Sequence, residues 1–263
     1  APARMGRRAA VDAPLRGHAK PTIEAMLDRV EQKRTADFYR AMLEAKRDWL
    51  DKKRKQESSD AVPIKPQRLI GEIAAAADDD AVFVCDTGTS TAWTARHLPV
   101  RPNQRYTLSS ALASMAFAMP GAIGAKLSYP DRQVIAIAGD GGLAMLMGDF
   151  VTAVRYELPI ICVVLNNRQL GFIALEQQAK GLPPHSIDLT NPDFAAFARA
   201  CGGFGSSVEH PSEIRAAFAK AVASGQPAII DVRVDPNELI LPPRISLEQA
   251  ANFGLSKLKA FLE

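Results

Sequence analysis

The sequence has few cysteines, few histidines and almost no net charge, and each scarcity argues against a class of protein. Its three cysteines are an odd and scattered set, so we expect reduced thiols and no disulfide framework. Its four histidines show no metal-ligand spacing. A formal net charge of +3 gives no reason to expect a nucleic acid partner. Because no apolar run could span a bilayer and no signal peptide is recognisable, we expect a cytoplasmic protein.

Short apolar runs alternate with helical patterns along most of the chain. This alternation predicts an α/β fold, a doubly wound parallel sheet with helices on both faces, preceded by a helical linker. The predicted strands are residues 81–85, 133–138, 160–165 and 228–234, and the predicted helices of the sheet domain are residues 67–77, 90–97, 111–127, 143–157, 171–180, 192–201 and 211–224. We expect residues 181–190 to form a loop and residues 247–263 a short amphipathic helix.

The segment Gly139-Asp140-Gly141-Gly142 lies between a predicted strand and a predicted helix. A glycine turn in this position presents backbone N–H groups to an anion. Asp140 would repel a phosphate there unless a divalent cation lay between the two. The next predicted strand is followed by Asn166-Asn167, and a carboxamide is a good neutral oxygen ligand for Mg²⁺ or Ca²⁺. Asp140 and Asn167 both follow carboxyl ends of strands, where open α/β sheets bind ligands.

Two other interpretations of these residues compete with a metal-bridged phosphate site. Gly139, Gly141 and Ala144 also fit the dinucleotide fingerprint of a Rossmann fold. In that scheme Asp140 has no partner, and Asn166-Asn167 stand where a ribose-binding acid would be expected. Alternatively, the glycines make only a tight turn and the asparagines only cap a helix.

Gly-Asp-Gly followed about two dozen residues later by Asn-Asn resembles the signature of thiamin-diphosphate-dependent enzymes. The surrounding sequence resembles the pyruvate oxidase and quinone-dependent pyruvate dehydrogenase branch, over GDGGLAMLMGDF and LPIICVVLNNRQLGFIALE. The resemblance runs from about residue 63 to residue 254. It implies a remnant of the middle, FAD-associated domain at residues 1–20, a helical linker at 21–61, the cofactor domain at 62–240 and a C-terminal helical tail at 241–263.

The resemblance implies that thiamin diphosphate and Mg²⁺ bind across the two motif strands. Asp140 and Asn167 would bind the metal through side-chain oxygens, and Gln169 through its backbone carbonyl. The segment at residues 86–90 would contact the phosphates, and the segment at residues 113–117 would lie under the bent cofactor, with Met115 between its rings. A methionine in an apolar segment is otherwise most often core filler. The implied cofactor-binding residues are Thr87, Gly88, Thr89, Ala113, Met115, Gly139, Gly141, Gly142, Leu170 and Gly171.

Phe172 and Glu176 are four residues apart, so a helix places them on one face. Pyruvate oxidases carry such a pair near the substrate, whereas acetolactate synthases carry Trp where Glu176 stands, so the pair favours the oxidase branch. Without the resemblance, Phe172 would be a core aromatic and Glu176 an exposed carboxylate.

The resemblance implies oxidative decarboxylation of pyruvate to acetate or acetyl phosphate through FAD. The activating glutamate and the flavin site would lie in domains outside this chain, so we expect a partner domain or subunit, a homo-oligomer, and membrane association only in a full-length form. The alternatives are another 2-keto acid carboligase or decarboxylase, such as an acetolactate synthase, and a non-catalytic assembly chain.

Overall fold

The computed structural model describes residues 5–7, 9–31, 36–238, 240 and 246–262. The chain divides into two compact units, residues 1–51 and 52–263, and the division falls within helix α2 (Asp37–Glu57). The first unit contains α1 (Ala19–Leu27) and most of α2, and no described residue of these two helices is buried. Among the described residues, no helix is long and apolar enough to cross a membrane. The expected domain boundaries remain a prediction, and residues 1–4, 8, 241–245 and 263 of the expected end segments lie outside the described residues.

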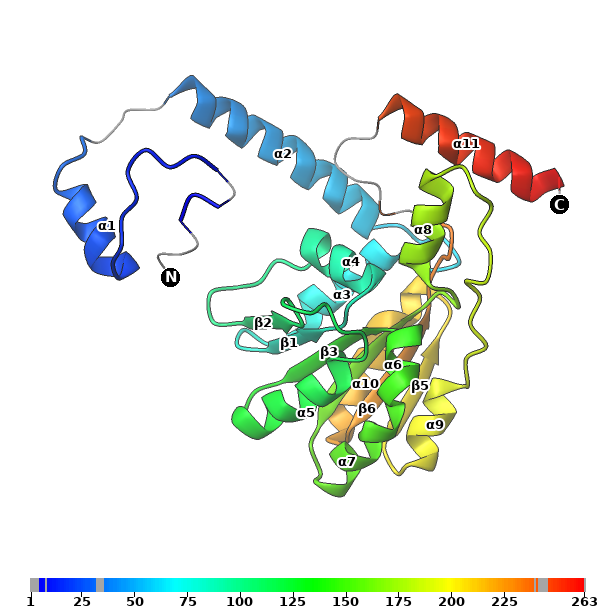
Figure 1. Cartoon of the computed structure of the whole chain (residues 1–263). Helices are drawn as coiled ribbons and strands as arrows, with labels where there is room; N and C mark the ends of the chain where they lie inside the picture. The colour runs from blue at the N-terminus through cyan, green and yellow to red at the C-terminus, as the bar shows by residue number, and fades with distance from the viewer. Residues whose placement is uncertain (1–4, 8, 32–35, 239, 241–245, 263) are drawn as a thin grey trace. The chain divides into compact units, whose positions relative to one another are not determined.

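The second unit is built on a six-stranded parallel sheet (Figure 1). Its strands are β1 (Val82–Cys85), β2 (Arg105–Leu108), β3 (Val134–Gly139), β4 (Ile160–Asn166), β5 (Phe204–Val208) and β6 (Ala228–Arg233). Their order in the sheet is β2-β1-β3-β4-β6-β5. The chain runs from β1 out to β2 and then returns to β3 on the other side of β1. The topological switch point, where doubly wound sheets bind ligands, therefore lies between β1 and β3.

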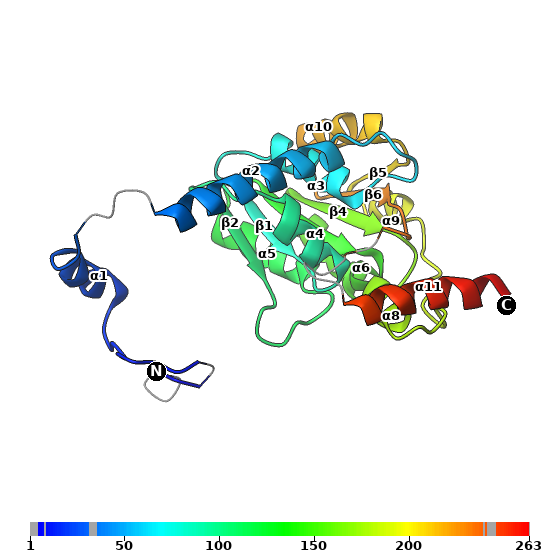
Figure 2. The same cartoon turned by 90° about the horizontal axis from the view of Figure 1, so that it is seen from above.

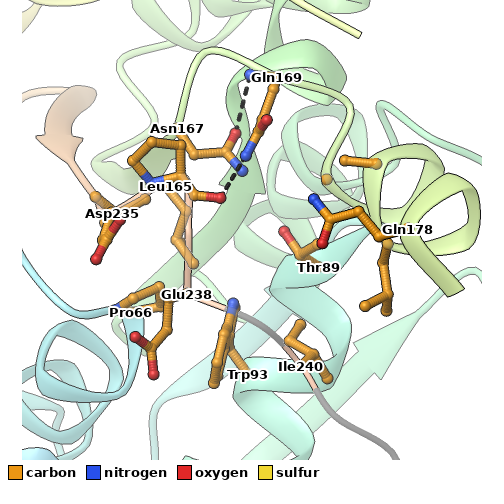
Figure 3. Close-up of a pocket in the computed structure, with 15 residues that line it drawn as sticks. Pro66, Thr89, Trp93, Leu165, Asn167, Gln169, Gln178, Asp235, Glu238 and Ile240 are labelled. Carbon is orange, nitrogen blue, oxygen red and sulfur yellow. Dashed lines mark hydrogen bonds between the residues drawn. The ribbon is translucent and has the colours of Figure 1, made fainter. Parts of the chain in front are cut away.

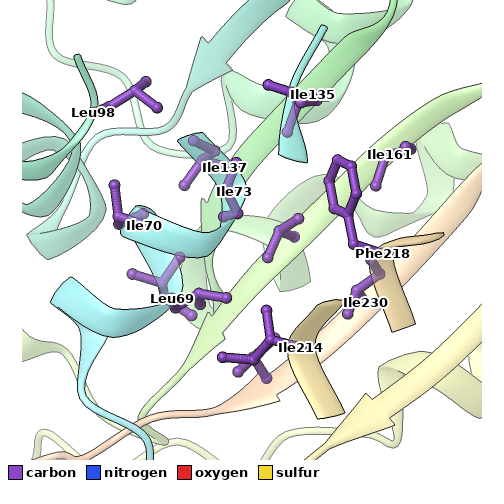
Figure 4. Packing of buried hydrophobic residues seen from close by; sticks show 14 of the residues in the cluster. Leu69, Ile70, Ile73, Leu98, Ile135, Ile137, Ile161, Ile214, Phe218 and Ile230 are labelled. Carbon is purple, nitrogen blue, oxygen red and sulfur yellow. The ribbon is translucent and has the colours of Figure 1, made fainter. Parts of the chain in front are cut away.

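Helices cover both faces of this sheet (Figures 1 and 2). One face packs against α3 (Pro66–Ala76), α4 (Thr89–His97) and α10 (Ile214–Ser224), and the other against α5 (Ala118–Ser128), α6 (Asp140–Leu146), α7 (Phe150–Arg155) and α9 (Phe194–Ala200). Successive residues of β3 alternate between the two cores, with Ile135 in one and Ala136 in the other. The first core is rich in branched side chains, and Figure 4 shows Leu69, Ile70, Ile73, Leu98, Ile135, Ile137, Ile161, Ile214, Phe218 and Ile230.

This architecture confirms the predicted fold class, but the sequence did not predict the two edge strands, β2 and β5. Most residues of both strands are partly or fully exposed to solvent, and β2 alternates between exposed and partly buried residues. The sequence of β5, Phe-Gly-Ser-Ser-Val, contains few residues that favour strands. An edge strand with this composition has no apolar run that would identify it.

Two of the predicted helices differ from the observed ones near the switch point. The helix expected from residue 111 begins at Ala118, because Ala113 and Ala116 have φ angles of 55° and 69° and cannot belong to a right-handed helix. The helix expected at residues 143–157 begins earlier, at Asp140, and is interrupted by the 3₁₀ turn η2 (Met147–Asp149) around Gly148. The tail forms α11 (Leu247–Leu262), which lies beside α8 (Gly171–Ala179) in both views.

Candidate functional site

A cavity of about 350 Å³ lies at the carboxyl ends of β1, β3 and β4, at the topological switch point. Sites for small molecules commonly have volumes of about 300–1,000 Å³. All the site residues predicted from the sequence line this cavity, although they come from separate segments: Thr87, Gly88, Thr89, Ala113, Met115, Gly139, Asp140, Gly141, Gly142, Asn167, Gln169, Leu170, Gly171, Phe172 and Glu176. Leu165 and Ile173, which the sequence did not single out, complete the lining.

Asp140 begins α6 and is only 2% exposed. Its Oδ1 accepts the N–H of Gly141 at 3.0 Å, and its Oδ2 accepts the N–H of Arg168 and the carboxamide N–H of Asn191, each at 2.7 Å. Burial raises the pKa of Asp140, and these hydrogen bonds oppose that rise. A cation beside Oδ1 would stabilise the charged carboxylate further.

The loop after β4 provides oxygen atoms beside Asp140. Asn167 lines the cavity, and its Oδ1 accepts the N–H of Gln169 at 3.2 Å, which leaves that oxygen a second lone pair. Arg168, between them, has a φ of 56°, a left-handed conformation that is uncommon for residues other than glycine. Such backbone strain costs about 1–3 kcal/mol and concentrates at functional sites.

A second, much smaller cavity of about 30 Å³ lies behind this loop (Figure 3). Asn167 and Gln169 line both cavities. The Gln169 side chain donates a hydrogen bond to the carbonyl oxygen of Pro236, which anchors the loop from behind. A space of this size has room for about one water molecule, so the small cavity is too small to bind a cofactor.

Close packing around the main cavity leaves no room for side chains at two of its glycines. A Cβ on Gly142 would lie 2.1 Å from Oδ2 of Asp86, and a Cβ on Gly171 would lie 2.7 Å from Cγ2 of Thr89. Helices α4 and α8 begin at Thr89 and Gly171, so their positive dipole ends also lie at the cavity. The N-termini of these two helices make the cavity favourable for an anionic group.

Asp86 is a buried residue beside this site whose own role was not predicted from the sequence. It directly follows β1, and its Oδ1 accepts the N–H groups of Thr87 at 2.8 Å and Phe117 at 3.1 Å. Its Oδ2 is buried without a hydrogen-bond partner in the described part of the chain. Burial raises the pKa of Asp86 to about 6. Its position, an acid immediately after a buried strand, matches that of the β4 and β3 motif residues and is the signal that could have identified it.

Apolar side chains surround the mouth of the cavity. Met115 and Phe172 line it and are each 38% exposed, and Ile173 lies next to Phe172 on α8. Glu176 is exposed on the same helix, one turn after Phe172, as the spacing predicted. The site thus combines a polar floor with an apolar, accessible rim.

Residues 86–232 match the family model described as "Thiamine pyrophosphate enzyme, C-terminal TPP binding domain". This range includes every residue that lines the main cavity. The chain belongs to this family. Thiamine pyrophosphate is the same molecule as thiamin diphosphate, so the cofactor class expected from the motif is confirmed.

Named relatives include several kinds of thiamin-diphosphate enzyme. The chain is 42% identical to YdaP of Bacillus subtilis (strain 168), which is named as a thiamine pyrophosphate-containing protein, over 100% of the chain and 46% of YdaP. It is 30% identical to a pyruvate oxidase of Lactiplantibacillus plantarum, over 99% of the chain and 43% of that protein. It is 29% identical to the acetolactate synthase isozyme 3 large subunit of Escherichia coli (strain K12), over 93% and 44%. The chain therefore spans less than half the length of these relatives.

The residues at the cavity fit a diphosphate bridged by a divalent ion. Among the described residues, no three His, Cys, Asp or Glu side chains gather where they could hold a metal ion. Asp140 and Asn167, which line the same cavity, instead offer carboxylate and carboxamide oxygens, and oxygen ligands of this kind suit Mg²⁺. Because Mg²⁺ usually completes its shell with phosphate oxygens and water, few protein ligands are needed.

We predict that Asp86→Asn flattens the pH dependence of stability. The pKa of Asp86 is about 6 in the folded protein and about 3.9 in an unfolded chain, so the folded state binds the proton more tightly. The resulting stabilisation is present below pH 4 and is lost as the pH rises through 6, a change of about 3 kcal/mol. Asparagine has the shape of the protonated acid and does not ionise. The measurement is the free energy of unfolding in urea from pH 4 to pH 7.

Relative to this variant, the wild-type protein should lose about 2 kcal/mol across that range, because part of the total change lies below pH 4. Asp131→Asn, at an exposed carboxyl group before β3, is the control and should follow the wild-type curve. Parallel curves for the wild type and Asp86→Asn would show that Asp86 is not protonated on folding.

Proposed function

We propose that this chain holds thiamin diphosphate through Mg²⁺ in an enzyme that oxidatively decarboxylates pyruvate, with FAD bound by another part of the same enzyme. The observation that carries the proposal is the arrangement of the main cavity. Its floor brings Asp140, Asn167 and Gln169 together, and its rim carries the Phe172 and Glu176 pair. Family membership supports the cofactor, and the named pyruvate oxidase relative supports the reaction.

Three oxygen donors would hold the metal ion in this proposal. Asp140 contributes Oδ1, Asn167 its carboxamide oxygen, and Gln169 its backbone carbonyl. The carboxylate supplies the single formal charge of the set, so it dominates the attraction for Mg²⁺. Backbone N–H groups in the turn at Gly141 and Gly142 would hold the diphosphate oxygens at the N-terminus of α6.

The rim residues would orient the organic part of the site. Thiamin diphosphate, when bound, supplies the electron sink that allows a 2-keto acid to lose carbon dioxide. Met115, which lines the cavity, would pack against the cofactor and exclude water from that surface. Phe172 would contact the small apolar group of the substrate, and Glu176, one turn later on α8, would add a carboxylate beside it.

A second candidate function is acetolactate synthesis, because the pyruvate oxidase and acetolactate synthase relatives are almost equally similar, at 30% and 29% identity. Glu176 favours the oxidase, since acetolactate synthases resemble the chain but carry Trp at this position. A third candidate is a non-catalytic assembly chain that retains the fold and pairs with a separate catalytic chain. In each case the exposed rim of the cavity is suited to a further domain or subunit, and a homo-oligomer remains our prediction.

We predict that Mg²⁺ and thiamin diphosphate bind together, each weakly without the other, because Asp140 repels a bare diphosphate. Titration calorimetry with Mg²⁺ and with EDTA measures this. Asp140→Ala should abolish the metal-dependent binding, whereas Asp131→Ala, at the opposite end of β3, should leave it unchanged. Equal affinity of the wild type for the diphosphate in EDTA would contradict the metal bridge.

The reaction is tested with the full-length form of the protein, supplied with pyruvate, thiamin diphosphate and Mg²⁺. We expect flavin reduction together with acetate or acetyl phosphate, and no net acetolactate. The 263-residue chain alone should decarboxylate pyruvate no faster than the free cofactor, because the activating glutamate and the flavin site would lie elsewhere. Acetolactate as the main product would favour the second candidate, and rapid turnover by the chain alone would contradict the proposed division of the active site.

A further inference from the structure

The two asparagines of the Asn166-Asn167 pair line different cavities. Asn167 lines the main cavity, whereas Asn166, the last residue of the strand, does not. Asn166 is 3% exposed and lines a separate polar hollow of about 260 Å³ with Arg168, Asn191 and Asp231. The Asn166 carboxamide therefore does not reach the main cavity directly. A metal ligand role for Asn167 leaves Asn166 unexplained.

Asn166 is the centre of a hydrogen-bond network. Its Nδ2 donates to Oδ1 of Asp231 at 2.9 Å, and its Oδ1 accepts from the guanidinium of Arg233 at 3.2 Å. The same Oδ1 accepts from Nδ2 of Asn191 at 3.1 Å. Because Asn191 also donates to Oδ2 of Asp140 at 2.7 Å, a continuous chain of hydrogen bonds runs from Asp231 on β6 to Asp140 at the end of β3.

We propose that Asn191, held by Asn166, is a positioning residue that fixes the Asp140 carboxylate for the metal ion. This inference rests on the proposed metal site. The carboxamide of Asn191 and the N–H of Arg168 together fix Oδ2 of Asp140. Among the hydrogen bonds described for Asp140, Oδ1 accepts one, from the N–H of Gly141 in the same turn. This oxygen keeps a lone pair for the cation. Hydrogen bonds thus hold Oδ2 in place and leave Oδ1 available to bind the cation.

The chemistry of a carboxamide suits this role better than that of other side chains. Its NH₂ group has two protons, which is the number needed to donate to Asp140 and Asn166 at once. It is neutral, so it leaves the negative charge of Asp140 intact, whereas lysine or arginine would compete with the cation. Groups that orient metal ligands in this way commonly change metal affinity by about 10–100-fold when removed.

The backbone on both sides of Asn191 is anchored by hydrogen bonds and packing. Asp193 caps α9 by accepting the N–H of Ala196 at 2.8 Å, and α9 packs against β5 and β6. On the other side, the N–H of Leu189 donates to the carbonyl of Arg168 at 2.9 Å. The segment that carries Asn191 is therefore attached both to the sheet and to the loop after β4, as a positioning residue requires.

The test uses the full chain and the variants Asn191→Ala and Asn191→Asp. The first removes both donors, and the second replaces the donor with a carboxylate that faces Asp140. Titrations of thiamin diphosphate at a series of Mg²⁺ concentrations give the Mg²⁺ concentration for half-maximal binding. We expect it to rise about 10–100-fold for Asn191→Ala and further for Asn191→Asp, with cofactor affinity at saturating Mg²⁺ close to that of the wild type. Asn252→Ala is the control, because this carboxamide joins α11 to the carbonyl of Ala179 and lies outside the network.

Crystal structures of the wild type and Asn191→Ala without cofactor give an independent reading, in which the Asp140 carboxylate should change orientation in the variant. If Asn191→Ala fails to fold, Asn166→Ala replaces it and should show a smaller rise in the Mg²⁺ midpoint and the same change at Asp140. Midpoints within twofold of the wild type, or an Asp140 carboxylate in an unchanged orientation, would overturn the inference. A wild-type chain without metal-dependent binding would overturn the proposed function, while the orientation of Asp140 would still decide the role of Asn191.

Discussion

A carboxylate buried at the end of β3, Asp140, is the constraint on which the arrangement of the site depends. Burying a charged group is costly unless hydrogen bonds or an opposite charge compensate it. Here the compensation comes from distant parts of the sequence, since Arg168 follows β4 and Asn191 precedes α9. The left-handed backbone at Arg168 follows from this requirement, because it turns the N–H toward Asp140 while the flanking residues line the cavity.

A second buried carboxylate, that of Asp86, positions a loop on the other side of the switch point. Asp86, at the end of β1, accepts the N–H of Phe117 and thereby holds the segment in which Ala113 and Ala116 adopt left-handed conformations. Gly142 lies directly against this carboxylate. Two buried acids at the ends of neighbouring strands thus determine where the loops of the cavity lie. Three of the five described non-glycine residues with a left-handed backbone, Ala113, Ala116 and Arg168, lie in these loops, as expected if strain is retained at a functional site.

The fold class and the lining of the cavity could be predicted from the sequence because they depend on local patterns. Buried strands such as β3 and β4 appear as short apolar runs, and the glycine and asparagine motifs follow directly after them. The edge strand β5 could not be predicted, because half-exposed strands of serine and glycine carry no such pattern. The start of α5 at Ala118 could not be predicted either, because it depends on a hydrogen bond between Asp86 and Phe117, which are far apart in the sequence. Asn191 was missed for the same reason.

The proposed site requires one divalent ion between Asp140 and the loop after β4. Anomalous diffraction from crystals grown with Mn²⁺ and thiamin diphosphate tests it most directly, because Mn²⁺ takes the same oxygen ligands as Mg²⁺ and can be located by its own signal. We expect one strong anomalous peak, about 2.1 Å from Oδ1 of Asp140, from the carboxamide oxygen of Asn167 and from the backbone carbonyl oxygen of Gln169. A bound cofactor with the Mn²⁺ peak elsewhere, or with no peak at Asp140, would contradict it.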